Sequence, residues 1–146
     1  MAEGVLREVM LALPMVPEME LEASKTAAAI AESIRMSPDR IDEVRLAVVE
    51  ACINALEHSQ SSDQEVFVTF QVLGDPDPEK LRIMVTDHGI GFSPGVQEEP
   101  AIGGKGGKIK GPQKRGFGLK IIHGLMDEVE IHSGADGTTV VMSKMR

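Results

Sequence analysis

The apolar and polar positions along the chain change period several times, and each change predicts a different element. Alternation rich in β-branched residues is typical of a strand, whereas an apolar stripe that recurs every three to four residues is typical of a helix. Residues 88–115 follow neither period and contain most of the run GGKGGKIKGPQKRG. The pattern predicts strands over 5–14, 65–73 and 80–87, two more strands within 128–145, and helices over 18–36, 37–59 and 117–129.

This order of elements predicts an α+β fold. The simplest arrangement is a mixed or antiparallel sheet with the helices on one face. No internal repeat or linker divides the chain, so residues 1–146 are expected to form a single domain. A long irregular segment inside a compact domain is usually a functional lid or disordered. Residues 88–115 therefore need a functional explanation.

Composition and charge narrow the class of protein. Apolar residues make up 42% of the chain but aromatic residues only 3%, which predicts an aliphatic core filled with methionine. The net charge of −8 argues against general nucleic-acid binding, which needs a basic face. The lone Cys52 excludes a disulfide within the chain and is expected to be a small buried hydrophobe. Without a membrane-length apolar run or a cationic N-terminal region, the chain is expected to be cytoplasmic, with no membrane partner.

A polar stripe runs along the second predicted helix. Glu50, Asn54 and His58 recur at every fourth position, and helical neighbours at that spacing share one face. An amide oxygen suits Mg²⁺, which usually takes few protein ligands plus substrate phosphates. A nearby carboxylate can orient water or accept a hydroxyl proton. The simpler reading is an exposed polar face, with His58 in a structural role at the helix end.

Two glycine motifs follow the predicted strands. Asp87 ends a strand and precedes Gly89 and Gly91, which is typical either of a turn or of a carboxylate beside a ligand that the backbone approaches closely. Gly116 and Gly118 lie at the junction between the irregular loop and the last predicted helix, in a local cluster of basic residues, which indicates either an anion site or a solvated loop. Neither the Walker A pattern nor the dinucleotide-binding glycine pattern fits the sequence.

Taken in order, the stretches EACINALEH, DHGIGF, RGFGL and GTTV resemble the GHKL superfamily, which includes gyrase, histidine kinases and related ATPases. The resemblance covers nearly the whole chain. It implies a two-layer α/β sandwich with a glycine-rich ATP lid at about residues 92–115, and it implies ATP and Mg²⁺ as cofactors. It also implies roles for individual residues: Glu50 as the general base, Asn54 as the Mg²⁺ ligand, Asp87 with Thr138 at the adenine, Gly89 and Gly91 beside it, and Lys114, Arg115, Gly116, Phe117, Gly118 and Leu119 at the phosphates.

Within the superfamily, the sequence stretches NALEHS and HGLMDEVEI resemble those of the RsbW/SpoIIAB-type anti-sigma factors. That resemblance implies a serine-protein kinase that phosphorylates a STAS-domain anti-anti-sigma partner. A sigma factor and a second copy of the chain are further partners that it allows. Two alternatives share the motifs: a nucleotide-gated binding module without phosphotransfer, and a positive-regulator kinase within a signalling complex.

Two features depart from the family pattern. Lys114 stands where an Arg is usual, and Lys cannot copy the bidentate grip of Arg on a phosphate, although the adjacent Arg115 could replace it. The lid is also longer and more basic than the compact lid expected of these kinases.

Overall fold

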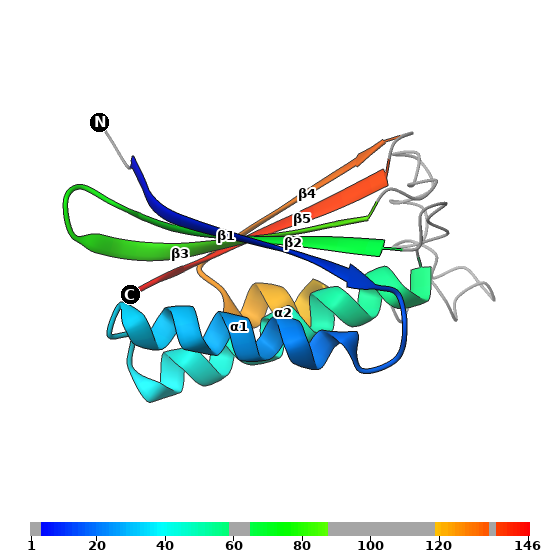
Figure 1. The fold of residues 1–146 in the computed structure, drawn as a ribbon, viewed down its shortest axis with the longest axis horizontal. Coiled ribbons are helices and arrows are strands. Elements are labelled where there is room, and N and C mark those ends of the chain that lie inside the picture. Colours follow the sequence, from blue (N-terminus) through cyan, green and yellow to red (C-terminus); the bar gives the residue numbers. More distant parts are fainter. Residues whose placement is uncertain (1–3, 59–64, 88–118, 135–136) are drawn as a thin grey trace.

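A computed structural model describes residues 4–58, 65–87, 119–134 and 137–146 of the protein. In this part of the chain one five-stranded sheet is covered on one face by helices (Figure 1). No helix among the described residues is long and apolar enough to cross a membrane. The two-layer α+β arrangement expected from the sequence is confirmed.

The strands pair in the order β1-β2-β3-β5-β4. All four pairings are antiparallel, so of the two arrangements expected from the sequence the antiparallel one is found. The last strand of the chain therefore lies inside the sheet, between β3 and β4. The strands are β1 (Gly4–Pro14), β2 (Glu65–Gly74), β3 (Pro78–Asp87), β4 (Glu128–Gly134) and β5 (Gly137–Met145).

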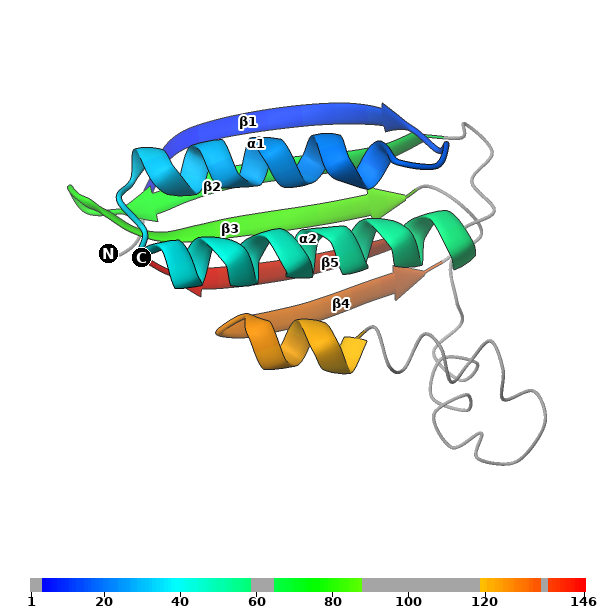
Figure 2. The same ribbon diagram turned by 90° about the horizontal axis from the view of Figure 1, so that it is seen from below.

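The described residues form three helical segments. These segments lie side by side on the same face of the sheet (Figure 2). Helix α1 (Met19–Ser33) lies over β1 and β2, and helix α2 (Pro38–His58) lies over β3 and β5. The helical residues 119–125, called the third helix below, lie beside β4. This third helix leads through two residues directly into β4.

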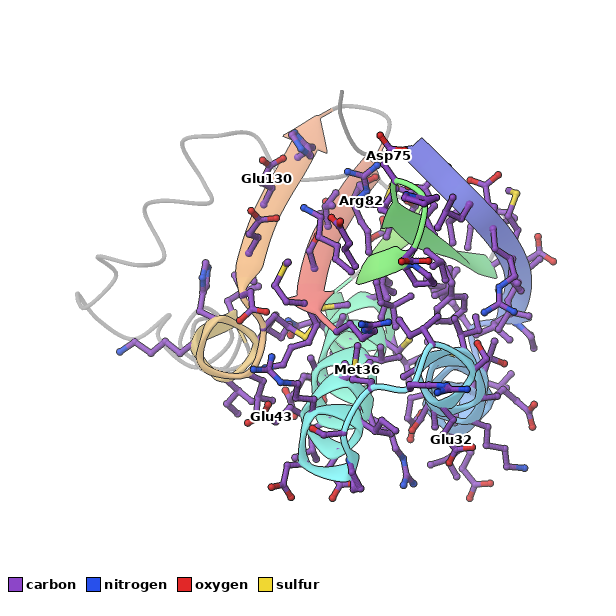
Figure 3. All side chains as sticks on the ribbon, turned by 90° about the vertical axis from the view of Figure 1, so that its left-hand side faces the viewer. Glu32, Met36, Glu43, Asp75, Arg82 and Glu130 are labelled. Atoms are coloured by element: carbon purple, nitrogen blue, oxygen red, sulfur yellow. The ribbon has the colours of Figure 1, made fainter. Side chains whose placement is uncertain are left out.

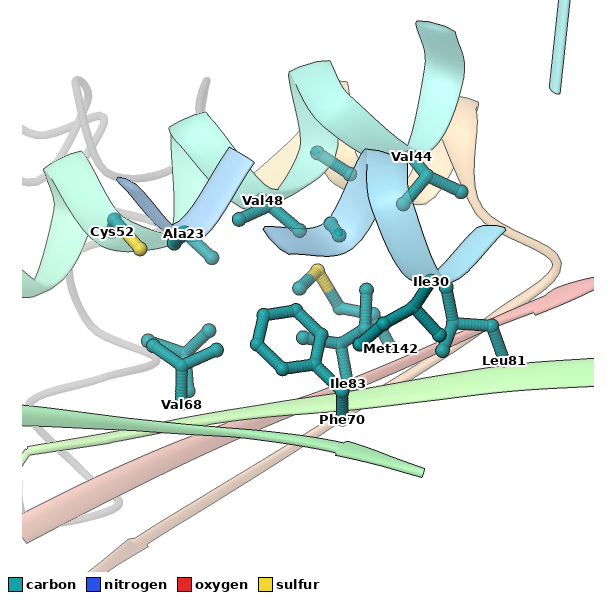
Figure 4. Close-up of a cluster of buried hydrophobic side chains, with 14 of the residues drawn as sticks. Ala23, Ile30, Val44, Val48, Cys52, Val68, Phe70, Leu81, Ile83 and Met142 are labelled. Carbon is teal, nitrogen blue, oxygen red and sulfur yellow. The ribbon is translucent and has the colours of Figure 1, made fainter. Parts of the chain in front are cut away.

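The core lies between the helices and the sheet (Figure 4). Inward positions alternate along the strands, as Val66, Val68 and Phe70 do on β2. From the helix side, Val44, Val48 and Cys52 of α2 close the same core. The expected aliphatic core with methionine is confirmed, since the buried residues include Met19, Met36, Met126 and Met142.

Polar side chains cover part of the opposite face of the sheet. Gln71 donates to a carboxylate oxygen of Glu8 at 2.8 Å, and Arg82 donates to Oε1 of Gln71 at 3.0 and 3.1 Å. Figure 3 shows Arg82 and Glu130 on this side, away from the helices. The sheet therefore has one apolar face toward the helices and one more polar face.

Candidate active site

The stripe on α2 that carries Glu50 and Asn54 lies on the side of the helix toward the third helix. Both residues are partly buried, among the fully or nearly buried Ala47 and Ala51. Glu43 lies seven positions before Glu50, which is two helical turns, so it belongs to the same stripe. Glu43 Oε1 and the Leu125 carbonyl of the third helix both contact Lys144 Nζ. Figure 3 shows Glu43 on that side of α2.

Asp87 and Thr138 face each other across β3 and β5. Asp87 is only 8% exposed and continues the inward alternation of Leu81, Ile83 and Val85. Thr138 likewise continues inward from Val140, and its hydroxyl lies 3.2 Å from that of Ser133 on β4. Because residues directly opposite in an antiparallel pair share a face, both side chains lie on the helix side of the sheet.

The described candidate residues gather at one end of the molecule. The carboxyl ends of α2 and β3 and the start of β5 lie at the same end of the sheet in Figure 2. This arrangement brings Asn54, Asp87 and Thr138 to that end. Leu119 begins the third helix, whose start faces the same end in Figure 2. Leu119 is partly buried and packs against the core.

The remaining candidates lie outside the described residues. They are Gly89, Gly91, Lys114, Arg115, Gly116, Phe117 and Gly118, together with the lid at about 92–115. Their assigned roles stay predictions. His58 is the last residue of α2.

No group of three or more His, Cys, Asp or Glu side chains in the described part of the chain could hold a metal ion. Asn54 supplies an amide oxygen on a partly buried stripe, one turn from a carboxylate. That donor fits Mg²⁺, which takes one or two protein ligands when phosphates supply others.

The sequence reasoning missed Lys144. Its ammonium lies 2.7 Å from Glu43 Oε1 on α2 and donates to the Leu125 carbonyl at 2.6 Å. A signal was present, because Lys144 interrupts the inward series of Thr138, Val140 and Met142 on β5. A lysine at an inward strand position is rarely buried unless it is paired.

The chain is similar to known proteins over most of its length. Residues 14–144 match the family model of the histidine kinase-like ATPase domain. The chain is 33% identical to the serine-protein kinase RsbW of Bacillus licheniformis and 31% identical to that of Bacillus velezensis. Each match covers 90% of this chain and 81% of the relative.

Among solved structures, the chain is similar to the RsbU and RsbW domains of Rv1364c from Mycobacterium tuberculosis, with a TM-score of 0.68. The match covers 95% of this chain and 32% of that protein's chain, at 19% sequence identity. At this identity the match establishes the fold alone. It agrees with the sheet and helix arrangement described above.

Proposed function

The chain belongs to the histidine kinase-like ATPase domain family, and we propose that it acts there as an RsbW-type serine-protein kinase. Its reaction is the transfer of the γ-phosphoryl group of ATP to a serine hydroxyl of a partner protein. The observation that carries this proposal is the gathering of Asn54, Asp87 and Thr138 at one end of the sheet, with Glu50 one turn from Asn54. The similarity to kinases of the same type supports it.

Asp87 would recognise the adenine base. A carboxylate accepts hydrogen bonds only, so it suits the exocyclic amino group of adenine. Its burial at the end of β3 supports this role because a hydrogen bond to a charged acceptor is strong where water is excluded. Thr138 lies directly opposite and would assist through its hydroxyl, while Gly89 and Gly91 would let the backbone approach the base.

Asn54 would hold Mg²⁺, and the second glycine motif would hold the phosphates. Bound Mg²⁺ would neutralise part of the phosphate charge. The backbone of Gly116 and Gly118 would approach the phosphates, with Lys114 and Arg115 as cationic neighbours. Leu119, at the start of the described third helix, would pack beside them. Residues 92–115 would act as the lid.

Glu50 would be the general base. Phosphoryl transfer needs mainly positioning and charge stabilisation, because the transition state is loose. The carboxylate of Glu50 would orient the serine hydroxyl and accept its proton as the new bond forms. The partial burial of this carboxylate, one helical turn from Asn54, supports the role.

We infer the partners from the same family resemblance. The substrate would be a STAS-domain anti-anti-sigma protein, and a sigma factor would be a second protein that the kinase holds. A second copy of the chain would form a homodimer. The cytoplasmic location expected from the sequence stays a prediction.

The test is intact-mass spectrometry of STAS-domain proteins from the same genome after incubation with the protein and MgATP. One candidate is expected to gain the mass of one phosphate. The Glu50→Ala variant is expected to bind ATP normally and to transfer about 10²–10⁴-fold more slowly, the usual contribution of a general base. The matched control is Asp42→Ala, which removes an exposed carboxylate elsewhere on α2.

Other outcomes would decide against parts of the proposal. ATP binding without phosphate on any candidate would indicate a nucleotide-gated binding module. Equal loss of binding and transfer in Glu50→Ala would make Glu50 a structural residue. Transfer to a STAS protein outside sigma-factor control would indicate a positive-regulator kinase.

A further inference from the structure

Lys144 is a buried cation between two helices. Its side chain is 8% exposed, and it leaves β5 on the helix side of the sheet. The ammonium lies 2.7 Å from Glu43 Oε1 on α2 and donates to the Leu125 carbonyl at 2.6 Å. One side chain therefore joins three elements: β5, α2 and the third helix.

The Leu125 carbonyl belongs to the last turn of the third helix, where carbonyls have no partner within the helix. A lysine at that end satisfies one of these carbonyls and interacts favourably with the helix dipole. The ion pair of the buried Lys144 with the half-exposed Glu43 is expected to contribute little net stability, because the cost of desolvating the ammonium offsets the attraction. The buried lysine at position 144 is therefore better explained by the way it positions the third helix than by a contribution to the stability of the fold.

The neighbours of Lys144 hold the same end of the third helix. The amide of Asp127 donates to the Ser143 carbonyl at 2.9 Å, and the amide of Met145 donates to Asp127 Oδ2 at 2.7 Å. Ile122 and Met126 are buried in the core. Three consecutive residues of β5 thus fix the end of the third helix against the sheet. Two of them also contact α2: Lys144 through the Glu43 carboxylate, and Met145, whose carbonyl accepts a hydrogen bond from Arg40 at 3.3 Å. Of these two contacts, the one made by the Lys144 ammonium joins α2 to the third helix through a single side chain.

We propose that Lys144 is a positioning residue for phosphoryl transfer, because it ties the Glu43–Glu50–Asn54 stripe of α2 to the third helix. This inference rests on the proposed function. The third helix follows the second glycine motif directly in the sequence, and the proposed function assigns that motif to the phosphates. We therefore expect the placement of the third helix to affect how the phosphates are held for transfer beside Glu50 and Asn54.

Lys144 acts at a distance from the adenine pair. It lies six residues along β5 from Thr138, which is about 20 Å in an extended strand. Its loss should therefore change the chemical step more than adenine recognition. A small misplacement of reacting groups can reduce a rate by about 10²-fold.

The test compares Lys144→Met with Lys80→Met. Both substitutions keep most of the aliphatic stem and remove a buried ammonium. Lys80 is 9% exposed and its ammonium lies 3.2 Å from Glu128 Oε1, so its ion pair joins β3 to β4. Lys80 alternates with the inward Leu81 on β3, which places it on the face away from the helices. The control Lys80→Met therefore also removes a buried charge, but it leaves the contacts of Lys144 with α2 and the third helix intact.

In Lys144→Met we expect kcat for transfer to the partner to fall at least 10-fold, with ADP affinity within threefold of wild type. We also expect faster amide hydrogen exchange in residues 119–125 than in wild type. Lys80→Met should leave both properties near wild type. If Lys144→Met does not fold, Glu43→Ala removes the half-exposed partner of the same tie and should lower kcat in the same direction.

Equal kcat values in Lys144→Met and Lys80→Met would overturn the positioning role. Unchanged amide hydrogen exchange in residues 119–125 of Lys144→Met would show that Lys144 does not hold the third helix in place. A wild-type protein that transfers no phosphate would instead overturn the proposed function, and the exchange result would still decide whether Lys144 holds the third helix.

Discussion

At the scale of single residues, Cys52 shows how burial sets chemical behaviour. It is fully buried on the sheet-facing side of α2, as expected for a small hydrophobe. Burial, and secondly the carboxylate of Glu20, raises the pKa of the Cys52 thiol to about 12. The thiol therefore keeps its proton in the folded protein at any pH near neutrality, and the thiolate is the reactive form.

We predict that native Cys52 resists alkylation. At pH 8.5 an unfolded cysteine is about half ionised, whereas the folded thiol remains protonated. Iodoacetamide labelling at that pH, followed by intact mass, should be at least about 100-fold slower for the native than for the urea-unfolded protein. Because the unfolded chain loses this proton first, the thiol's contribution to stability falls as pH rises from about 8.5 toward 12.

The Cys52→Ala variant serves as the control. It should show no labelling, and its stability should decline less than that of wild type as pH rises above about 8.5. Rapid labelling of the native protein would contradict the buried position of the thiol.

At the scale of elements, the start of α2 was predictable because its signals are local. Ser37 precedes Pro38, and proline is favoured at the first helical position. In the structure the Ser37 hydroxyl accepts a hydrogen bond from the Arg40 amide at 3.3 Å, and the Ser37 carbonyl accepts from the Ile41 amide at 2.9 Å. Ser37 therefore caps α2.

We predict that Ser37→Ala lowers the free energy of unfolding by about 0.5–1 kcal/mol, the lower part of the range for an N-cap, since the bond is long. Urea denaturation would measure the loss. Ser37→Asp, which keeps an acceptor at the cap, should stay near wild type. Equal losses in the two variants would mean that the hydroxyl does not act as a cap.

Other helix ends were not predictable from local patterns. The expected first helix ran to residue 36, but α1 ends at Ser33 because Arg35 takes a left-handed conformation with φ of 64°. The expected third helix ran to residue 129, but β4 begins at Glu128. The Asp127 amide already bonds to the Ser143 carbonyl of β5. The end of α1 thus depends on the backbone conformation of a single residue. The end of the third helix depends on a contact with a strand that is distant in sequence.

At the scale of the whole molecule, the sheet order decides the site. The strands could be predicted from alternation, but the insertion of β5 between β3 and β4 could not, because it is a long-range pairing. That insertion places Thr138 opposite Asp87. The family motifs identified both residues, but they did not predict that the two residues lie opposite each other. Lys144 lay outside those motifs, and its partners come from two other elements, so only the assembled fold reveals it.

The last prediction concerns the stability of the whole domain with nucleotide bound. A ligand that binds only the folded state at 100 times its Kd adds about 2.7 kcal/mol to the free energy of unfolding. For a domain of this size that corresponds to a rise in Tm of about 5–11 °C. Thermal unfolding should show this rise for wild type with MgATP, and Asp87→Asn should show almost none.

The control for this measurement is Asp77→Asn, in the exposed turn between β2 and β3. That turn lies at the end of the sheet opposite Asp87, so Asp77→Asn should keep the full rise with MgATP. Without nucleotide, Asp87→Asn must still unfold cooperatively, because only then does its missing rise report lost binding. A full rise in Asp87→Asn would remove Asp87 from the adenine site. The adenine would then have to be recognised by other residues, and the pairing of Asp87 with Thr138 would be purely structural.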